Sequence, residues 1–167
     1  MKSLKHYTIA GIFFVLITGT FAHFLYEWSG DNAIVGLFTP VNESIWEHMK
    51  LLFFPMLSYA AFMFFRLKDE CPCIASSLCL GILTGTLLIP ILFYAYTGLL
   101  GRDYFVLDIG IFIVSTLCAF LVFYRLALSC KGKPHTIFLC VLTGIFLIAF
   151  LLFTYHPPEL FLFAEPL

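Results

Sequence analysis

The chain has 167 residues, of which 62% are hydrophobic and only 11% are charged. A soluble domain carries roughly 25% charged residues and about 45–50% apolar ones, so a water-soluble globule is excluded. Intrinsic disorder is excluded as well, because it requires low hydrophobicity and high charge. The net charge of −1 at pH 7 lacks the basic surplus of a nucleic-acid-binding protein. The composition therefore predicts an integral membrane protein.

Five apolar segments are long enough to cross a bilayer, whose hydrocarbon core of about 30 Å requires roughly 20 helical residues. In chain order they are Tyr7–Trp28, Glu43–Phe65, Ile74–Leu99, Tyr104–Leu126 and Ile137–Tyr155. Continuous apolar runs of this length are typical of transmembrane helices, since a helix satisfies its own backbone hydrogen bonds in lipid. No long linker divides them, so we expect residues 1–167 to form a single all-α transmembrane domain of five helices.

The basic residues predict how these helices are oriented. With the N-terminus inside, seven of the nine Lys and Arg residues lie on the cytoplasmic side: Lys2, Lys5, Arg66, Lys68, Arg125, Lys131 and Lys133. The positive-inside rule therefore favours an N-in, C-out multi-pass protein of the cell membrane. In that orientation Cys71, Cys73 and Cys130 lie on the reducing side, where we expect free thiols.

The segment Asp31–Pro40, before the second span, is apolar but too short to cross the bilayer. It predicts a short re-entrant or interfacial segment. Thr39 and Pro40 are the residue types favoured at a helix N-cap and at the first helical position. We therefore expect the second helix to begin at these residues.

Acidic and histidine side chains gather at the predicted outer ends of the spans. Eight of the ten acids and three of the five histidines lie there: Glu27, Asp31, Glu43, Glu47, Asp103, Asp108, Glu159, Glu165, His23, His48 and His156. Ionisable groups in membrane helices cost several kcal/mol by insertion scales, so they usually face the bundle interior and mark function. The outer ends are therefore predicted to form a polar site.

The densest polar run lies at the start of the second span. At about 100° per residue, Glu43, Glu47 and Lys50 share one sector of the helix, and Ser44 and His48 share the adjoining sector. A competing interpretation makes this a solvated helix end, in which Glu47 and Lys50 form an ordinary surface pair. We also expect Glu47 to lie on the exposed sector, so that Glu47→Gln should have little effect.

Two sequence patterns carry a resemblance to known families. Residues 39–48, Thr-Pro-Val-Asn-Glu-Ser-Ile-Trp-Glu-His, together with His-Phe-Leu-Tyr-Glu-Trp at 23–28, resemble the signature of a small bacterial multi-pass membrane family of unknown function. A second similarity is to alkaline-ceramidase-like membrane hydrolases, which carry Ser-x-x-x-His, an aspartate and a zinc bound by three histidines. Ser44 and His48 match that spacing, and Asp108 matches the acid. That group has seven helices and His-x-x-x-His on its last helix, where this chain has only His156.

The hypothesis that follows is a membrane-embedded, metal-dependent hydrolase with an outward-facing site. The predicted Zn²⁺ ligands are His23, His48 and His156, which leave a fourth position for water. The predicted catalytic residues are Glu43 or Asp108 as general base and Ser44 as oxyanion donor. The supporting residues are Glu27, Asn42 and Glu47. A lipid-like amide or ester is the expected substrate, because it reaches such a site from the lipid bilayer.

Two other classes of function are compatible with the same residues. The acidic site suits a transporter or a substrate-binding membrane subunit for a cation or a small cationic solute. Alternatively, the polar cluster only holds helices together in a non-catalytic assembly or immunity protein. Measurements of bound metal and of pH-dependent solute uptake distinguish these alternatives, since the absence of both would favour the non-catalytic protein.

Overall fold

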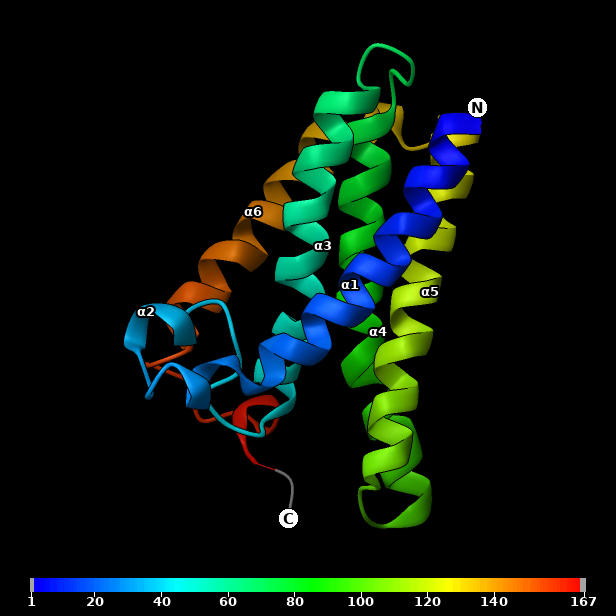
Figure 1. The fold of residues 1–167 in the computed structure, drawn as a ribbon. Helices are drawn as coiled ribbons and strands as arrows, with labels where there is room; N and C mark the ends of the chain where they lie inside the picture. The colour runs from blue at the N-terminus through cyan, green and yellow to red at the C-terminus, as the bar shows by residue number, and fades with distance from the viewer. Residues whose placement is uncertain (1, 166–167) are drawn as a thin grey trace.

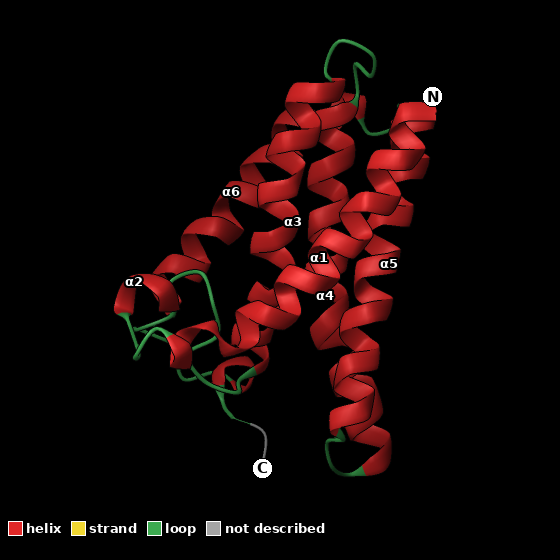
Figure 2. Ribbon diagram, viewed as in Figure 1, coloured by secondary structure: helices red, strands yellow, loops and turns green. Residues whose placement is uncertain are grey.

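The computed structural model describes residues 2–165, and over that range it contains helices and loops but no strand (Figure 2). The long helices are α1 (Lys2–Trp28), α3 (Ile45–Leu67), α4 (Ile74–Leu100), α5 (Phe105–Ser129) and α6 (Thr136–Phe153). Each of these five helical segments is long and apolar enough to cross a membrane. The predicted all-α architecture with five spanning helices is therefore confirmed.

The helices form a bundle around α3 and α4 (Figure 1). α3 packs against α1 and α4, and α4 packs in turn against α5 and α6. A Cβ atom added at Gly85 of α4 would lie 2.7 Å from Cβ of Ala119 on α5. Only a glycine permits this close approach of α4 to α5, as in other small-residue contacts between membrane helices.

Three short elements complete the fold: α2 (Ala33–Gly36), η1 (Lys133–His135) and η2 (Phe161–Phe163). The segment expected to be re-entrant or interfacial contains α2, whose N-cap Asn32 accepts a hydrogen bond from the Ile34 amide at 2.9 Å. Tyr155, just beyond α6, donates to the Ala33 carbonyl at 2.9 Å. α2 is therefore attached to the last helix as well as to its own neighbours in the chain.

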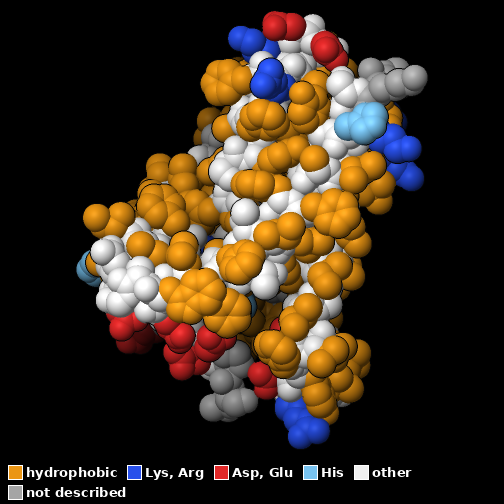
Figure 3. All heavy atoms as spheres, in the orientation of Figure 1, with side chains coloured by type: hydrophobic (Ala, Val, Ile, Leu, Met, Phe, Trp, Pro, Cys, Tyr) orange, Lys and Arg blue, Asp and Glu red, His pale blue; other side chains and the backbone are white. Residues whose placement is uncertain are grey.

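Charged side chains lie mainly at the two ends of the bundle, with a broad apolar band between them (Figure 3). We call the end formed by the last turn of α1, by α2 and by the first turns of α3 and α5 the acidic end. The N-terminus lies at the opposite end (Figure 1). The apolar band fits a lipid bilayer, and the N-in, C-out orientation stays a prediction.

Contrary to what their residue types predict, Thr39 and Pro40 do not begin the second spanning helix, although the predicted apolar span from Glu43 lies close to it. Its first helical residue is Ile45, and Ser44 is the N-cap. The Asn42 side chain accepts a hydrogen bond from the Ser44 amide at 3.0 Å, which holds residues 42–44 in a turn. Thr39 instead donates to the Val35 carbonyl at 2.9 Å and so lies in the turn that follows α2.

The expectation of free thiols at the opposite end is also wrong in part. Cys73, the N-cap of α4, forms a disulfide with Cys130, the C-cap of α5. The packing of α4 against α5 brings their Cα atoms to 5.3 Å, inside the usual disulfide range. Cys71 is a free, buried cysteine beside this bond.

Candidate metal centre

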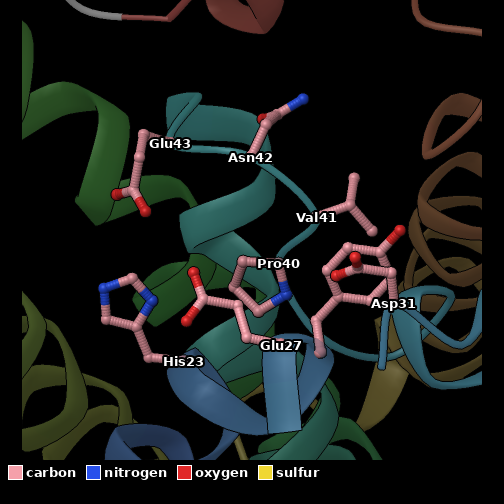
Figure 4. A pocket seen from close by; sticks show the side chains of 8 residues that line it. His23, Glu27, Asp31, Pro40, Val41, Asn42 and Glu43 are labelled. Atoms are coloured by element: carbon pink, nitrogen blue, oxygen red, sulfur yellow. The ribbon is translucent and has the colours of Figure 1, made fainter. Parts of the chain in front are cut away.

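Three potential metal ligands converge at the acidic end from separate parts of the chain. His23 lies on the last turns of α1, Glu43 lies in the loop before α3, and His48 lies in the first turn of α3. One ligand atom from each lies within 4.8 Å of the others. Figure 4 shows the Glu43 carboxylate facing the His23 ring. This spacing suits a single metal ion bound by two imidazoles and one carboxylate.

The hydrogen bonds of His48 determine which of its nitrogens is available. Nδ1 lies 3.0 Å from the Ser44 carbonyl oxygen, which can only accept, so Nδ1 carries the hydrogen. Nε2 lies 3.3 Å from a carboxylate oxygen of Glu43. If His48 were neutral, the lone pair of its Nε2 atom would point at the negatively charged Glu43 carboxylate. A cation is therefore required at this point, either a second proton on the ring or a metal ion.

His23 supplies independent support for a ligand at this position. Its ring centroid lies 5.3 Å from that of His48. Its Nδ1 is buried and has no hydrogen-bonding partner among the described residues. A buried polar atom without a partner lowers stability, and a bond to a metal ion would satisfy it.

Glu43 is the most exposed member of the group, with 67% of its side chain accessible. The hydrogen bond from His48 is the main reason that the pKa of the Glu43 carboxyl lies below its usual value, and the nearby charges of His48 and His23 act in the same direction. Glu43 is therefore ionised around neutral pH, the state in which a carboxylate binds metal.

A cavity of about 140 Å³ adjoins the group (Figure 4). Its lining residues are His23, Tyr26, Glu27, Asp31, Pro40, Val41, Asn42 and Glu43. The volume is sufficient for a few water molecules, at about 30 Å³ each. Glu27 projects into this space beside His23 (Figure 4). Glu27, Asp31 and Glu43 thus give this cavity three carboxylates.

The surface interpretation of Glu47 and Lys50 is wrong. Glu47 is 2% exposed and Lys50 is completely buried. The Lys50 ammonium donates to the Glu47 carboxylate at 2.7 Å and to the Thr154 hydroxyl at 2.6 Å. It also donates to the Gly36 carbonyl at 3.1 Å. The pair is buried because the loop after α2 and the end of α6 close over the first turn of α3.

This buried pair positions the loop that carries Glu43. The same Glu47 oxygen that binds Lys50 accepts a hydrogen bond from the Val41 amide at 3.0 Å. Gly36 and Val41 are thereby held to the first turns of α3, on both sides of Pro40. Glu47 and Lys50 consequently support the three-residue group without belonging to it.

Ser44 is 1% exposed, and its hydroxyl oxygen accepts a hydrogen bond from the Glu47 amide at 3.4 Å. Its carbonyl accepts the Nδ1–H of His48. Both groups therefore organise the start of α3 and orient His48. Asn42, expected as a supporting residue, holds Ser44 in its turn.

Asp108 lies near the group of His23, Glu43 and His48, whereas His156 does not. Asp108, in the first turn of α5, accepts a hydrogen bond from Tyr96 at 2.5 Å and is close enough to His48 to affect it electrostatically. His156 is exposed beyond the end of α6, and the structure does not bring it to the three-residue group. Glu43 is the third potential ligand in that group.

Comparison with known proteins assigns the chain to a family. A model of the family of unknown function DUF6512 matches residues 1–167. The chain belongs to that family. No curated protein and no solved structure matches it. The similarity to ceramidase-like hydrolases therefore gains no support from relatives.

Proposed function

We propose that this protein is a zinc-dependent hydrolase of the cell membrane whose metal ion is bound by His23, Glu43 and His48. The observation that carries the proposal is the convergence of these three ligands within 4.8 Å. Two histidines and one carboxylate, with a fourth position open to water, form a recurrent catalytic zinc site. The unpartnered nitrogen of His23 supports a metal over a purely structural cluster, and the orientation of His48 is compatible with one.

The chemistry would use a water molecule at the open metal position. Bound zinc lowers the pKa of its water towards about 7. Glu27, which lines the cavity with His23 and Glu43, would accept the proton as the water oxygen attacks the substrate carbonyl carbon. Glu27 would then return that proton to the leaving oxygen or nitrogen as the bond between that atom and the carbonyl carbon breaks. Glu43 acts as ligand in this scheme, and Asp108 adds negative charge near His48.

The substrate class follows from the position of the site at one end of five membrane-spanning helices. An amphiphilic amide or ester held in the bilayer presents its carbonyl group at that depth. We therefore propose a lipid-like amide or ester as substrate.

A cation-binding or transport role is the second candidate, favoured by one specific observation. Glu27, Asp31 and Glu43 all line the small cavity beside the histidines. Three carboxylates concentrate cations and repel anions, which suits a site that captures a metal ion as cargo. Both candidates require metal at the same three ligands, so metal binding is tested first.

The first experiment measures zinc by elemental analysis after purification in mild detergent without added metal. We expect about one equivalent in the wild type and a loss in both His23→Ala and His48→Ala. His135→Ala, an exposed histidine at the opposite end, is the matched control and should retain zinc. Zinc-free wild type, or full zinc in His48→Ala, would refute the metal centre.

The second experiment separates hydrolysis from transport. Glu27→Gln should retain zinc but lose turnover of fluorogenic lipid esters and amides by about 10²–10⁴-fold, the usual contribution of a general base. Zinc uptake into proteoliposomes, without turnover of any tested ester or amide, would favour the transport role and contradict the hydrolase.

A further inference from the structure

A second, larger cavity lies at the acidic end and shares no residue with the first. Its volume is about 410 Å³. Its lining residues are Ile45, Phe93, Tyr94, Thr97, Gly101, Arg102, Asp103, Phe161, Ala164 and Glu165. The inner part, beside Ile45 and Phe93, is apolar, and the charged side chains come from the α4–α5 loop and from the C-terminal segment. The cavity is thus amphiphilic, as a membrane lipid is.

The C-terminal segment around η2 is fixed in place as one wall of this cavity. Tyr94 donates a hydrogen bond to the Phe161 carbonyl at 3.3 Å. The ring of Phe163 lies 4.8 Å from Trp46 and 5.7 Å from Phe153, measured between centroids. These contacts tie the segment to α3, α4 and α6. The wall is therefore formed before any ligand binds.

The cavity is lined by one cationic and two anionic side chains. Arg102 donates through Nε to the Tyr104 hydroxyl at 2.8 Å, and its guanidinium carbon lies 4.7 Å from the centroid of the same ring. This contact orients the guanidinium, whose four other N–H groups are not used in that bond. Asp103 and Glu165 add two carboxylates to the same lining. One cation and two anions at the end of an apolar cavity complement a zwitterion attached to a lipid chain.

We propose that this cavity binds a phospholipid with an ethanolamine headgroup. Arg102 would pair with the phosphate, for which the planar guanidinium offers two parallel hydrogen bonds. Asp103 and Glu165 would accept hydrogen bonds from the primary ammonium, which has three donors. The apolar part beside Ile45, Phe93 and Phe161 would cover the start of the acyl chains.

The two carboxylates distinguish this lipid from its common alternatives. An anionic glycerol headgroup carries no ammonium and would leave Asp103 and Glu165 facing the negative charge of the phosphate. A choline headgroup has no N–H to donate to a carboxylate. Free phosphate or soluble glycerophosphoethanolamine would not occupy the apolar part. The proposal uses none of the metal ligands, so it stands or fails independently of the zinc site.

The test uses the full chain, delipidated in detergent, with lipid added in mixed micelles. Thermal unfolding is followed as a function of the concentration of phosphatidylethanolamine, phosphatidylcholine, phosphatidylglycerol or glycerophosphoethanolamine. We expect saturable stabilisation by phosphatidylethanolamine, because a ligand that binds only the folded state raises the unfolding temperature. Arg102→Gln should weaken this apparent affinity about tenfold, as expected for a lost charge-assisted contact.

Matched controls come from the opposite end of the bundle. Arg66 is exposed and also lies against an aromatic ring, 5.6 Å from the centroid of Phe62, so Arg66→Gln should leave lipid affinity unchanged. Asp103→Asn should reduce the preference for ethanolamine over choline, whereas Asp69→Asn should not. Equal stabilisation by all three phospholipids, an unchanged affinity in Arg102→Gln, or equal binding of glycerophosphoethanolamine would overturn the proposal.

Discussion

Removing the buried ammonium of Lys50 should destabilise the protein more than any other single change at the acidic end. Lys50→Met retains much of the side-chain volume but deletes the donor to Glu47, Thr154 and Gly36. Among the described residues, the Glu47 carboxylate then stays buried with the Val41 amide as its one remaining hydrogen-bond donor. Breaking one half of a buried ion pair costs about 3–5 kcal/mol.

Substitution of the partner, Glu47, should destabilise the protein less than Lys50→Met does. Glu47→Gln leaves the Lys50 ammonium its contacts with Thr154 and Gly36, so we expect a smaller loss of about 1.5–3 kcal/mol, typical of one charged hydrogen bond. The double variant Lys50→Met, Glu47→Leu removes both charges and should recover much of the loss, since an apolar pair of similar volume is often tolerated.

The assay is reversible unfolding in mixed detergent micelles, followed by the fluorescence of buried Trp46, with the two single variants and the double variant forming a cycle. Lys68→Met, an exposed lysine at the opposite end, is the control and should stay within about 0.5 kcal/mol of wild type. A similarly small effect of Lys50→Met would refute the claim that this pair anchors the loop before α3.

Three further predictions follow from other parts of the structure. Since the hydrogen bond from His48 lowers the pKa of Glu43, the Glu43 carboxylate stabilises the fold fully above pH 4.5, its ordinary value, and loses this effect as the pH falls through the lowered pKa. Glu43→Gln should therefore flatten the acid limb of a plot of thermal stability against pH, and an unchanged limb would contradict this. Gly85→Ala should destabilise by about 1–3 kcal/mol through contact with α5, whereas Gly98→Ala, with open space around it, should be neutral or stabilising by thermal unfolding. Peptide mapping without reductant should recover the Cys73–Cys130 crosslink, and two free thiols at these positions would contradict it.

The sequence was sufficient to predict the five spans because each is a continuous apolar run with turn residues on either side. The start of the second helix was missed because Thr39 and Pro40 satisfy the local preferences of an N-cap, while the side-chain contact from Asn42 to Ser44 selects a later start. Local residue preference does not reveal which of two acceptable caps is used.

The candidate site was predicted in part. His23 and His48 lie together, and Glu43, rather than His156, is the third potential ligand beside them. His156 lies in the loop after α6, so its direction is not described by helical periodicity. The burial of Lys50 was equally inaccessible, because its partner Thr154 lies 104 positions away in the chain. Spacing predicts neighbours on one helix, whereas these contacts are set by tertiary packing.

The unequal lengths of the helices have a consequence for the surrounding bilayer. α4 has 27 residues and α6 has 18, which correspond to roughly 40 Å and 27 Å at about 1.5 Å per residue. Figure 1 shows the α4–α5 hairpin extending beyond the acidic ends of α3 and α6. Lipids beside α6 therefore contact a shorter apolar surface than lipids beside the hairpin. The membrane must thin near α6 or the helices must tilt. This hydrophobic mismatch makes the packing of the helices at the acidic end sensitive to acyl-chain length, a variable that reconstitution in bilayers of defined thickness controls directly.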